Sequence, residues 1–193
     1  MWSEHFGRVE QVAELVRQRG LPFHMTLDHS HVIFKMDNPK EQQVQGMKAD
    51  IDAGHLILDP AQSGNVASRW IDANWVCLAH ARAAVPANPV NTRACHPDGS
   101  FGRGIQYPFM APAPGEYLAD WNASLLDPWK RTMRDLLAHH ATHEASPIRH
   151  ISCEHIVGVD YGAGHTYSTF DNNVACARWL RDEWGQALTA ATQ

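Results

Sequence analysis

Four ionisable side chains occupy the same kind of position, the C-terminal end of a predicted strand: Glu4, Asp28, His80 and Glu154. They are 24, 52 and 74 residues apart, and because the C-terminal ends of parallel strands share one face of an α/β fold, we expect them to converge. A single carboxylate at a strand end is more often a helix cap or a solvated charge than a metal ligand. Four ionisable residues at equivalent positions of four strands favour a site. Three carboxylates and one imidazole suit Mn²⁺ or Mg²⁺, with Co²⁺ or Zn²⁺ tolerated through the imidazole. The pattern predicts one divalent cation.

The elements that must position these residues alternate along the chain. Apolar runs predict strands at 21–27, 74–79 and 148–153, with a short one at 1–3. Apolar residues at helical spacing predict helices around 9–16, 44–51, 66–71, 129–137 and 177–188. Strands separated by helices favour a parallel sheet with right-handed crossovers. We therefore expect one α/β domain over residues 1–193.

Residues 84–126 differ from this pattern because they are rich in proline, glycine and aromatic residues. A long irregular stretch inside a compact domain is usually a functional lid or a disordered linker. The aromatic residues favour the ordered alternative, so we interpret 84–126 as a lid insertion.

Composition narrows the class of protein. The chain has 193 residues, 44% of them hydrophobic, and a net charge of −5, which argues against a nucleic-acid-binding protein. No apolar run is long enough to span a membrane, and the N-terminus lacks a signal pattern, so we expect no membrane partner. The four cysteines are widely spaced and lack a C-x-x-C pair, which fits a reducing, cytoplasmic location. The 13 histidines again favour metal or acid–base chemistry.

Several other polar residues have simpler structural interpretations. His139, His140 and His143 fall near a predicted helix C-terminus, where caps are more common than ligands. His155 should point to the face opposite Glu154 and serve a structural or supporting role. The pair His96 and Asp98 fits a proline turn better than an extra metal pair. The glycines of 160–164 lack the spacing of a phosphate loop.

Four segments together resemble the xylose-isomerase-like TIM barrels, which include sugar isomerases and epimerases, inosose dehydratases and endonuclease-IV-type enzymes. MTLDHSH at 25–31 is similar to the D-x-x-H of strand six, and VCLAHAR at 76–82 to the histidine-bearing strand seven. GRGI at 102–105 resembles the following G-x-G-x-[IL] turn, and ISCE at 151–154 the end of strand eight. Arg82 departs from the pattern, because the family commonly has an acidic residue nearby. The resemblance covers only the C-terminal half of the barrel, with Glu4 falling at the end of strand five.

The resemblance implies an incomplete parallel (β/α) barrel of the TIM type, with four to five strands corresponding to strands 5–8. It implies Glu4, Asp28, His80 and Glu154 as metal ligands and His31 as a contact to a substrate oxygen. In that scheme the metal would hold two adjacent oxygens of a sugar while Glu4 and Glu154 remove and return a carbon-bound proton through an ene-diolate. Arg82, Arg103 and His96 are further candidates for binding distal hydroxyls.

Three classes of function follow from the sequence. The first is a metal-dependent ketose or aldose isomerase or epimerase acting on a small carbohydrate. The second is a hydrolase or lyase on the same metal platform, and the third is a non-catalytic half-barrel that completes a partner. An open half-barrel would leave strand edges unpaired, so we expect a homo-oligomer or a partner chain that supplies the missing strands.

Overall fold

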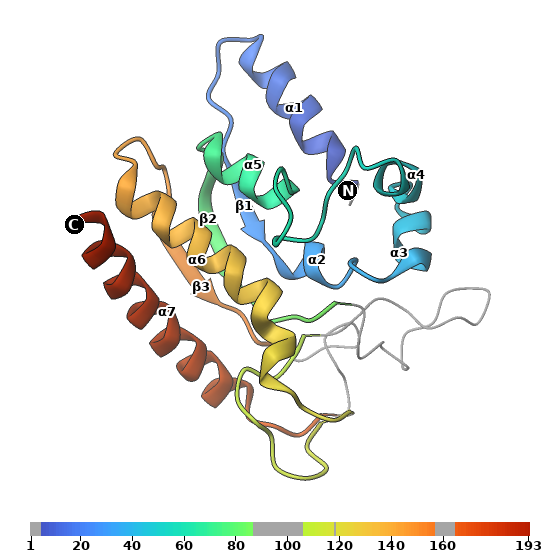
Figure 1. The fold of residues 1–193 in the computed structure, drawn as a ribbon, viewed down its shortest axis with the longest axis vertical. Helices are drawn as coiled ribbons and strands as arrows, with labels where there is room; N and C mark the ends of the chain where they lie inside the picture. The colour runs from blue at the N-terminus through green and yellow to red at the C-terminus, as the bar shows by residue number, and fades with distance from the viewer. Residues whose placement is uncertain (1–4, 87–105, 118, 157–164) are drawn as a thin grey trace.

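The computed structural model is a mixed α/β fold, and it describes residues 5–86, 106–117, 119–156 and 165–193 (Figure 1). In these residues seven α-helices, one short 3₁₀ helix (η1) and three strands follow one another along the chain. The elements in order are α1 (Gly7–Arg17), β1 (Met25–Asp28), α2 (Ser30–Ile33), α3 (Pro39–Val44), α4 (Lys48–Asp52), α5 (Val66–Asp72), β2 (Val76–Ala81), η1 (Ala123–Leu126), α6 (Asp127–Thr142), β3 (His150–Cys153) and α7 (Thr169–Ala191). None of these helices is long and apolar enough to cross a membrane.

The three strands form a parallel sheet in the order β1-β2-β3, as the alternation of strands and helices predicts. The register pairs Asp28 with His80 and His80 with Ser152, so the ends of the strands are level. The strand predicted at 1–3 lies outside the described residues. Over the residues that the structure describes, the sheet is open, and a closed TIM barrel is not formed.

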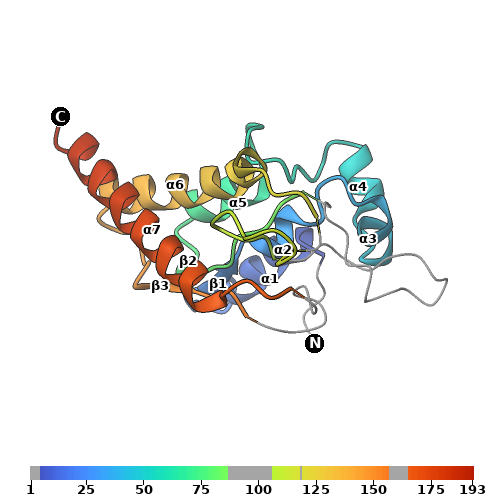
Figure 2. The same ribbon diagram turned by 90° about the horizontal axis from the view of Figure 1, so that it is seen from below.

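The two faces of the sheet have opposite character. Leu27, Ala79 and Ala81 point toward the helices and are at most 2% exposed. Thr26, His150 and Ser152 lie on the other face and are exposed. Figure 2 shows α5 and α6 along the same side of the three strands. Parallel sheets are usually covered on both faces, so this polar face is an unusual open surface in the described part of the chain.

Helices α6 and α7 follow the predicted apolar spacing. Trp129, Met133 and Leu136 are buried along one side of α6, and Cys176 and Leu180 are buried on α7. Proline occupies the first turn of α6, where a missing amide hydrogen costs nothing. The two helices pack on each other and on the sheet, which holds β3 against β2.

The single helix expected around 44–51 is wrong, because the chain forms two short helices there, α3 and α4. Gly46 adopts a left-handed conformation with φ of 73°, which stops α3 and lets the Met47 amide donate to the Gln42 carbonyl. Val44 is 54% exposed whereas Met47 is fully buried, so the two residues do not share a buried face. Helix α2, directly after β1, was not expected.

The described part of the 84–126 segment packs onto the domain. Tyr107 is fully buried, and its hydroxyl accepts a hydrogen bond of 2.7 Å from the Asn122 amide. Asn172 of α7 accepts hydrogen bonds from the amides of Phe109 and Met110. These contacts fit the ordered alternative for 106–117 and 119–126. Residues 87–105 and 118 lie outside the described part, and the role as a lid stays a prediction.

Candidate metal centre

Three of the four predicted metal ligands meet at the C-terminal edge of the sheet. Asp28 ends β1, His80 lies near the end of β2, and Glu154 directly follows β3. One candidate ligand atom from each residue lies within 4.8 Å of the other two. The convergence arises because the parallel register brings the ends of three consecutive strands together. Glu4 lies outside the described residues.

The centre is partly open to solvent. His80 Nδ1 is 3.1 Å from Glu154 Oε2, and these side chains are 33% and 31% exposed. Asp28 is more enclosed, with a side chain 13% exposed. A small ligand could therefore reach His80 and Glu154 while Asp28 stays fixed at the back of the site.

Asp28 is held on both of its carboxylate oxygens. The Ser30 amide and hydroxyl donate to Oδ1 at 3.1 and 2.5 Å, and this local turn follows from an aspartate two residues before the donor. Arg82 donates to Oδ2 at 2.5 Å. The carboxylate thus has a fixed orientation before any ligand binds.

Arg82 connects the side chains of this network, and it is itself buried, at 2% exposed. Its Nε donates to the Ser30 hydroxyl at 3.0 Å, and a terminal nitrogen lies 3.0 Å from His31 Nε2. His31 Nε2 is also 3.5 Å from Asp28 Oδ2. Sequence reasoning placed Arg82 on substrate hydroxyls, whereas the structure directs its guanidinium toward Asp28, Ser30 and His31. In the structure Arg82 therefore contacts a candidate metal ligand, Asp28.

The spacing of the donor atoms is compatible with a divalent cation. Ligands about 2.1 Å from an ion lie about 3 Å apart when adjacent and about 4.2 Å apart when opposite. The His80–Glu154 separation of 3.1 Å meets the first value, and one atom from each of the three residues lies within 4.8 Å of the other two.

Two buried residues beside the centre were missed by sequence reasoning. Lys35 is fully buried, lies over the rings of Phe6 and Phe34 at 5.4 and 4.8 Å, and donates to the His31 carbonyl at 3.3 Å. Lys35 lies in the turn that follows α2, which ends at Ile33, and a lone lysine at that position gave no signal in the sequence. His29 is fully buried, and its Nε2 lies 2.8 Å from Thr132 Oγ1 of α6. Burial lowers the pKa of His29 to about 3, so the ring is neutral.

The remaining predicted residues divide into structural groups and groups outside the described part. His155 is 3% exposed, with its Nε2 3.2 Å from the Tyr107 carbonyl, which confirms a structural role. Burial lowers its pKa as well. His143 Nδ1 lies 3.0 Å from the His139 carbonyl at the end of α6, as expected for a cap. His96 and Arg103 lie outside the described residues, so their roles stay predictions.

Comparisons with protein-family models, with curated proteins and with solved structures found no match. Functional interpretation therefore rests on the geometry of the strand ends.

Proposed function

We propose that Asp28, His80 and Glu154 hold one divalent cation and that the protein is a metal-dependent isomerase or epimerase of small hydroxy-aldehydes or hydroxy-ketones. The observation that carries this proposal is the meeting of three candidate ligands from three consecutive parallel strands. Mn²⁺ and Mg²⁺ suit a mostly oxygen donor set, and the imidazole would also accept Co²⁺ or Zn²⁺.

When bound, the cation would polarise adjacent substrate oxygens and stabilise the negative charge that develops on them. Glu154 has the position of a proton acceptor, because it lies at the open side of the centre and is one-third exposed. The sequence expectation gives Glu4 the matching role on the opposite side. Arg82 keeps the Asp28 carboxylate oriented, and its fixed positive charge favours an anionic intermediate nearby.

The open face of the sheet supports a hydroxylated substrate. Thr26, His150 and Ser152 are exposed on the face that carries the centre, and each can donate and accept hydrogen bonds. His31, beside Asp28, has the position to polarise a substrate oxygen. A polar surface next to a cation favours a small polyol over an apolar ligand.

For the fold, we propose that the three strands belong to the C-terminal half of a parallel (β/α) barrel. Neighbouring strands in this sheet are consecutive in sequence, and α5 and α6 lie on one side, both of which are properties of such barrels. The centre at the carboxyl ends of the strands also has the usual location of a barrel active site.

The test of the metal centre is Glu154→Gln, which keeps the shape of the side chain and removes its charge. We expect Mn²⁺ affinity, measured by calorimetry, to fall by at least about 100-fold, because outer-shell changes alone cost 10- to 100-fold. The matched control is Glu144→Gln, an exposed carboxylate outside the centre, which should bind Mn²⁺ normally. Wild-type affinity in the Glu154→Gln protein would contradict the assignment.

The test of the reaction is exchange of substrate carbon-bound hydrogen with D₂O, followed by NMR over a panel of aldoses and ketoses. An isomerase or epimerase should incorporate deuterium beside the carbonyl in the metal-loaded wild type and not in Glu154→Gln. Hydrolysis or water elimination without exchange would instead support the hydrolase or lyase class on the same metal platform.

A further inference from the structure

Two free cysteines meet where β3 ends beside α7. Cys153 is the last residue of β3, and Cys176 lies on the buried side of α7. The two residues are 23 positions apart in the sequence, and their thiols hydrogen bond to each other. The fold therefore brings together two sulfur atoms that are widely spaced along the chain.

The backbone of β2 fixes this meeting point. The Ala81 carbonyl oxygen accepts a hydrogen bond of 3.2 Å from the amide of Glu154, the residue after Cys153, and the same oxygen is 4.0 Å from Cys176 Sγ. In the register of the sheet, Ala81 is also the partner of Cys153. Both cysteines are therefore held against one peptide group at the end of the sheet, in the core that α7 shares with the strands.

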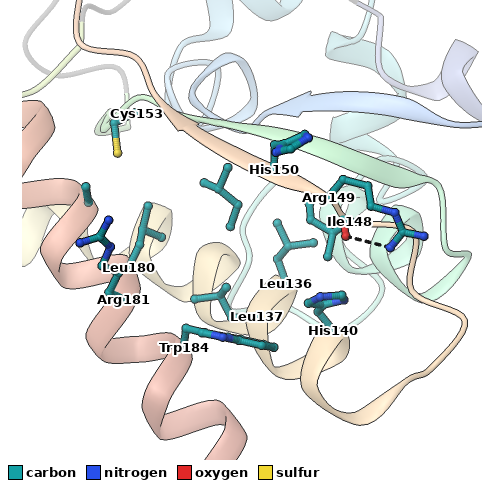
Figure 3. Close-up of a pocket in the computed structure, with 12 residues that line it drawn as sticks. Leu136, Leu137, His140, Ile148, Arg149, His150, Cys153, Leu180, Arg181 and Trp184 are labelled. Atoms are coloured by element: carbon teal, nitrogen blue, oxygen red, sulfur yellow. Dashed lines mark hydrogen bonds between the residues drawn. The ribbon is translucent and has the colours of Figure 1, made fainter.

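The two thiols differ in their access to solvent. Cys153 is half-buried and lines a groove of about 390 Å³ between β3, α6 and α7. Figure 3 shows its side chain leaving the end of β3 toward the helices. Cys176 is fully buried and does not line the groove. A small oxidant that enters the groove therefore reaches Cys153 first.

Cys77 offers a comparison within the same sheet. It is also half-buried, but it lies near the start of β2, and its thiol donates to the Met25 carbonyl at 3.5 Å. Cys95 lies outside the described residues. Among the cysteines that the structure describes, Cys153 and Cys176 are the two whose sulfur atoms contact each other.

We propose that Cys153 and Cys176 form a redox modification site, at which hydrogen peroxide converts the two thiols into a disulfide between β3 and α7. In the first step the Cys153 sulfur attacks one peroxide oxygen, an S–O bond forms, the O–O bond breaks, and the other oxygen leaves as water with the thiol proton. In the second step the Cys176 sulfur attacks the resulting sulfenic acid, an S–S bond forms, the S–O bond breaks, and a second water leaves. Two thiols and one hydrogen peroxide thus give one disulfide and two waters.

The proximity of the thiols decides the product. A neighbouring thiol held in the same core acts at a far higher effective concentration than a thiol in solution. The hydrogen bond places the two sulfur atoms so that rotation of the side chains can bring them to the bond length of about 2.05 Å. No step uses the candidate metal ligands, so the proposal stands without the metal assignment.

The test is oxidation of the full chain by hydrogen peroxide, followed by alkylation of the remaining thiols and peptide mapping by mass spectrometry. Trypsin releases residues 150–178 as one peptide that contains both cysteines, and a second cut after Glu154 separates them unless a disulfide joins them. We expect the two fragments to stay joined until dithiothreitol is added. This link should form at least about tenfold faster than any link to Cys77 or Cys95.

Three variants separate the roles of the thiols. Cys176→Ala should leave Cys153 as a sulfenic acid that dimedone traps. Cys153→Ala should leave Cys176 unoxidised, because Cys176 is fully buried. The matched control, Cys77→Ala, should form the disulfide at the wild-type rate. Circular dichroism establishes that each variant is folded.

The stability of the oxidised wild type tests whether the fold already holds the thiols in position. Because the disulfide closes a loop of 23 residues, the midpoint of urea unfolding should rise by about 1 M. A disulfide that does not raise the midpoint overturns the proposal, since the fold would then have to distort to form it. Oxidation of Cys153 in the wild type without a bond to Cys176 also overturns it, as does faster linkage to another cysteine.

Discussion

The ion pair between Arg82 and Asp28 allows a sharp test of how the centre is built. We consider Arg82→Met, which keeps a long flexible side chain and removes the charge. Arg82 is 2% exposed and Asp28 13% exposed, so the substitution leaves a largely buried carboxylate without its counter-ion. Breaking such a pair typically costs about 3–5 kcal/mol. We expect a loss of that size in the free energy of unfolding.

The matched control is Arg69→Met. Arg69 Nε lies 3.0 Å from Glu10 Oε1, and the two side chains are 38% and 39% exposed. Exposed pairs contribute only about 0–1 kcal/mol because water screens them. The same substitution in two ion pairs therefore separates the effect of burial from the effect of the pair itself.

The assay is urea unfolding followed by tryptophan fluorescence, since the chain has seven tryptophans. The double variant Arg82→Met with Asp28→Asn should recover part of the stability, because the orphaned charge is then gone. Added Mn²⁺ should stabilise Arg82→Met more than the wild type, since a cation can replace the lost positive charge. A loss below 1 kcal/mol, or equal losses in Arg82→Met and Arg69→Met, would refute the reasoning.

Five further substitutions, at four positions, test the roles of individual side chains. Thr132→Val should cost about 1–3 kcal/mol in urea unfolding, because it leaves the buried Nε2 of His29 without its partner. Asn65→Ala should cost about 1 kcal/mol in thermal unfolding by removing the N-cap of α5, and Asn65→Asp should restore most of it. Asp28→Asn should weaken Mn²⁺ binding in calorimetry while His31→Ala should raise KM with metal affinity retained, and equal losses of metal affinity would mean that His31 is itself a ligand.

The strand ends could be predicted from sequence because each is an apolar run that stops at a polar residue. Asp28, His80 and Glu154 were found in this way, and the parallel register brings them together without further information. The partner of Arg82 could not be predicted, because the pairing with Asp28 spans 54 residues and depends on how β1 and β2 sit side by side. Sequence patterns also report no burial for a lone lysine, so Lys35 was missed.

Helix boundaries show a second limit of sequence patterns. Val44, Met47 and Ile51 have helical spacing, yet Gly46 ends one helix before the next begins. The spacing of the apolar residues indicates that all three lie near a helix. It does not indicate that the chain turns between them. Helices α6 and α7 were predicted well because long apolar stripes outweigh any single residue.

The convergence of three strand ends also bears on how the protein folds. Asp28, His80 and Glu154 are 52 and 74 residues apart, so no fragment with fewer than three strands contains the whole centre. Contacts between such distant segments form slowly, because long loops must close first. A metal ion that needs all three side chains would therefore bind late and draw the folding equilibrium toward the finished sheet. Metal uptake would then measure when the domain completes its fold, and its rate would be the rate at which the long loops between the strands close.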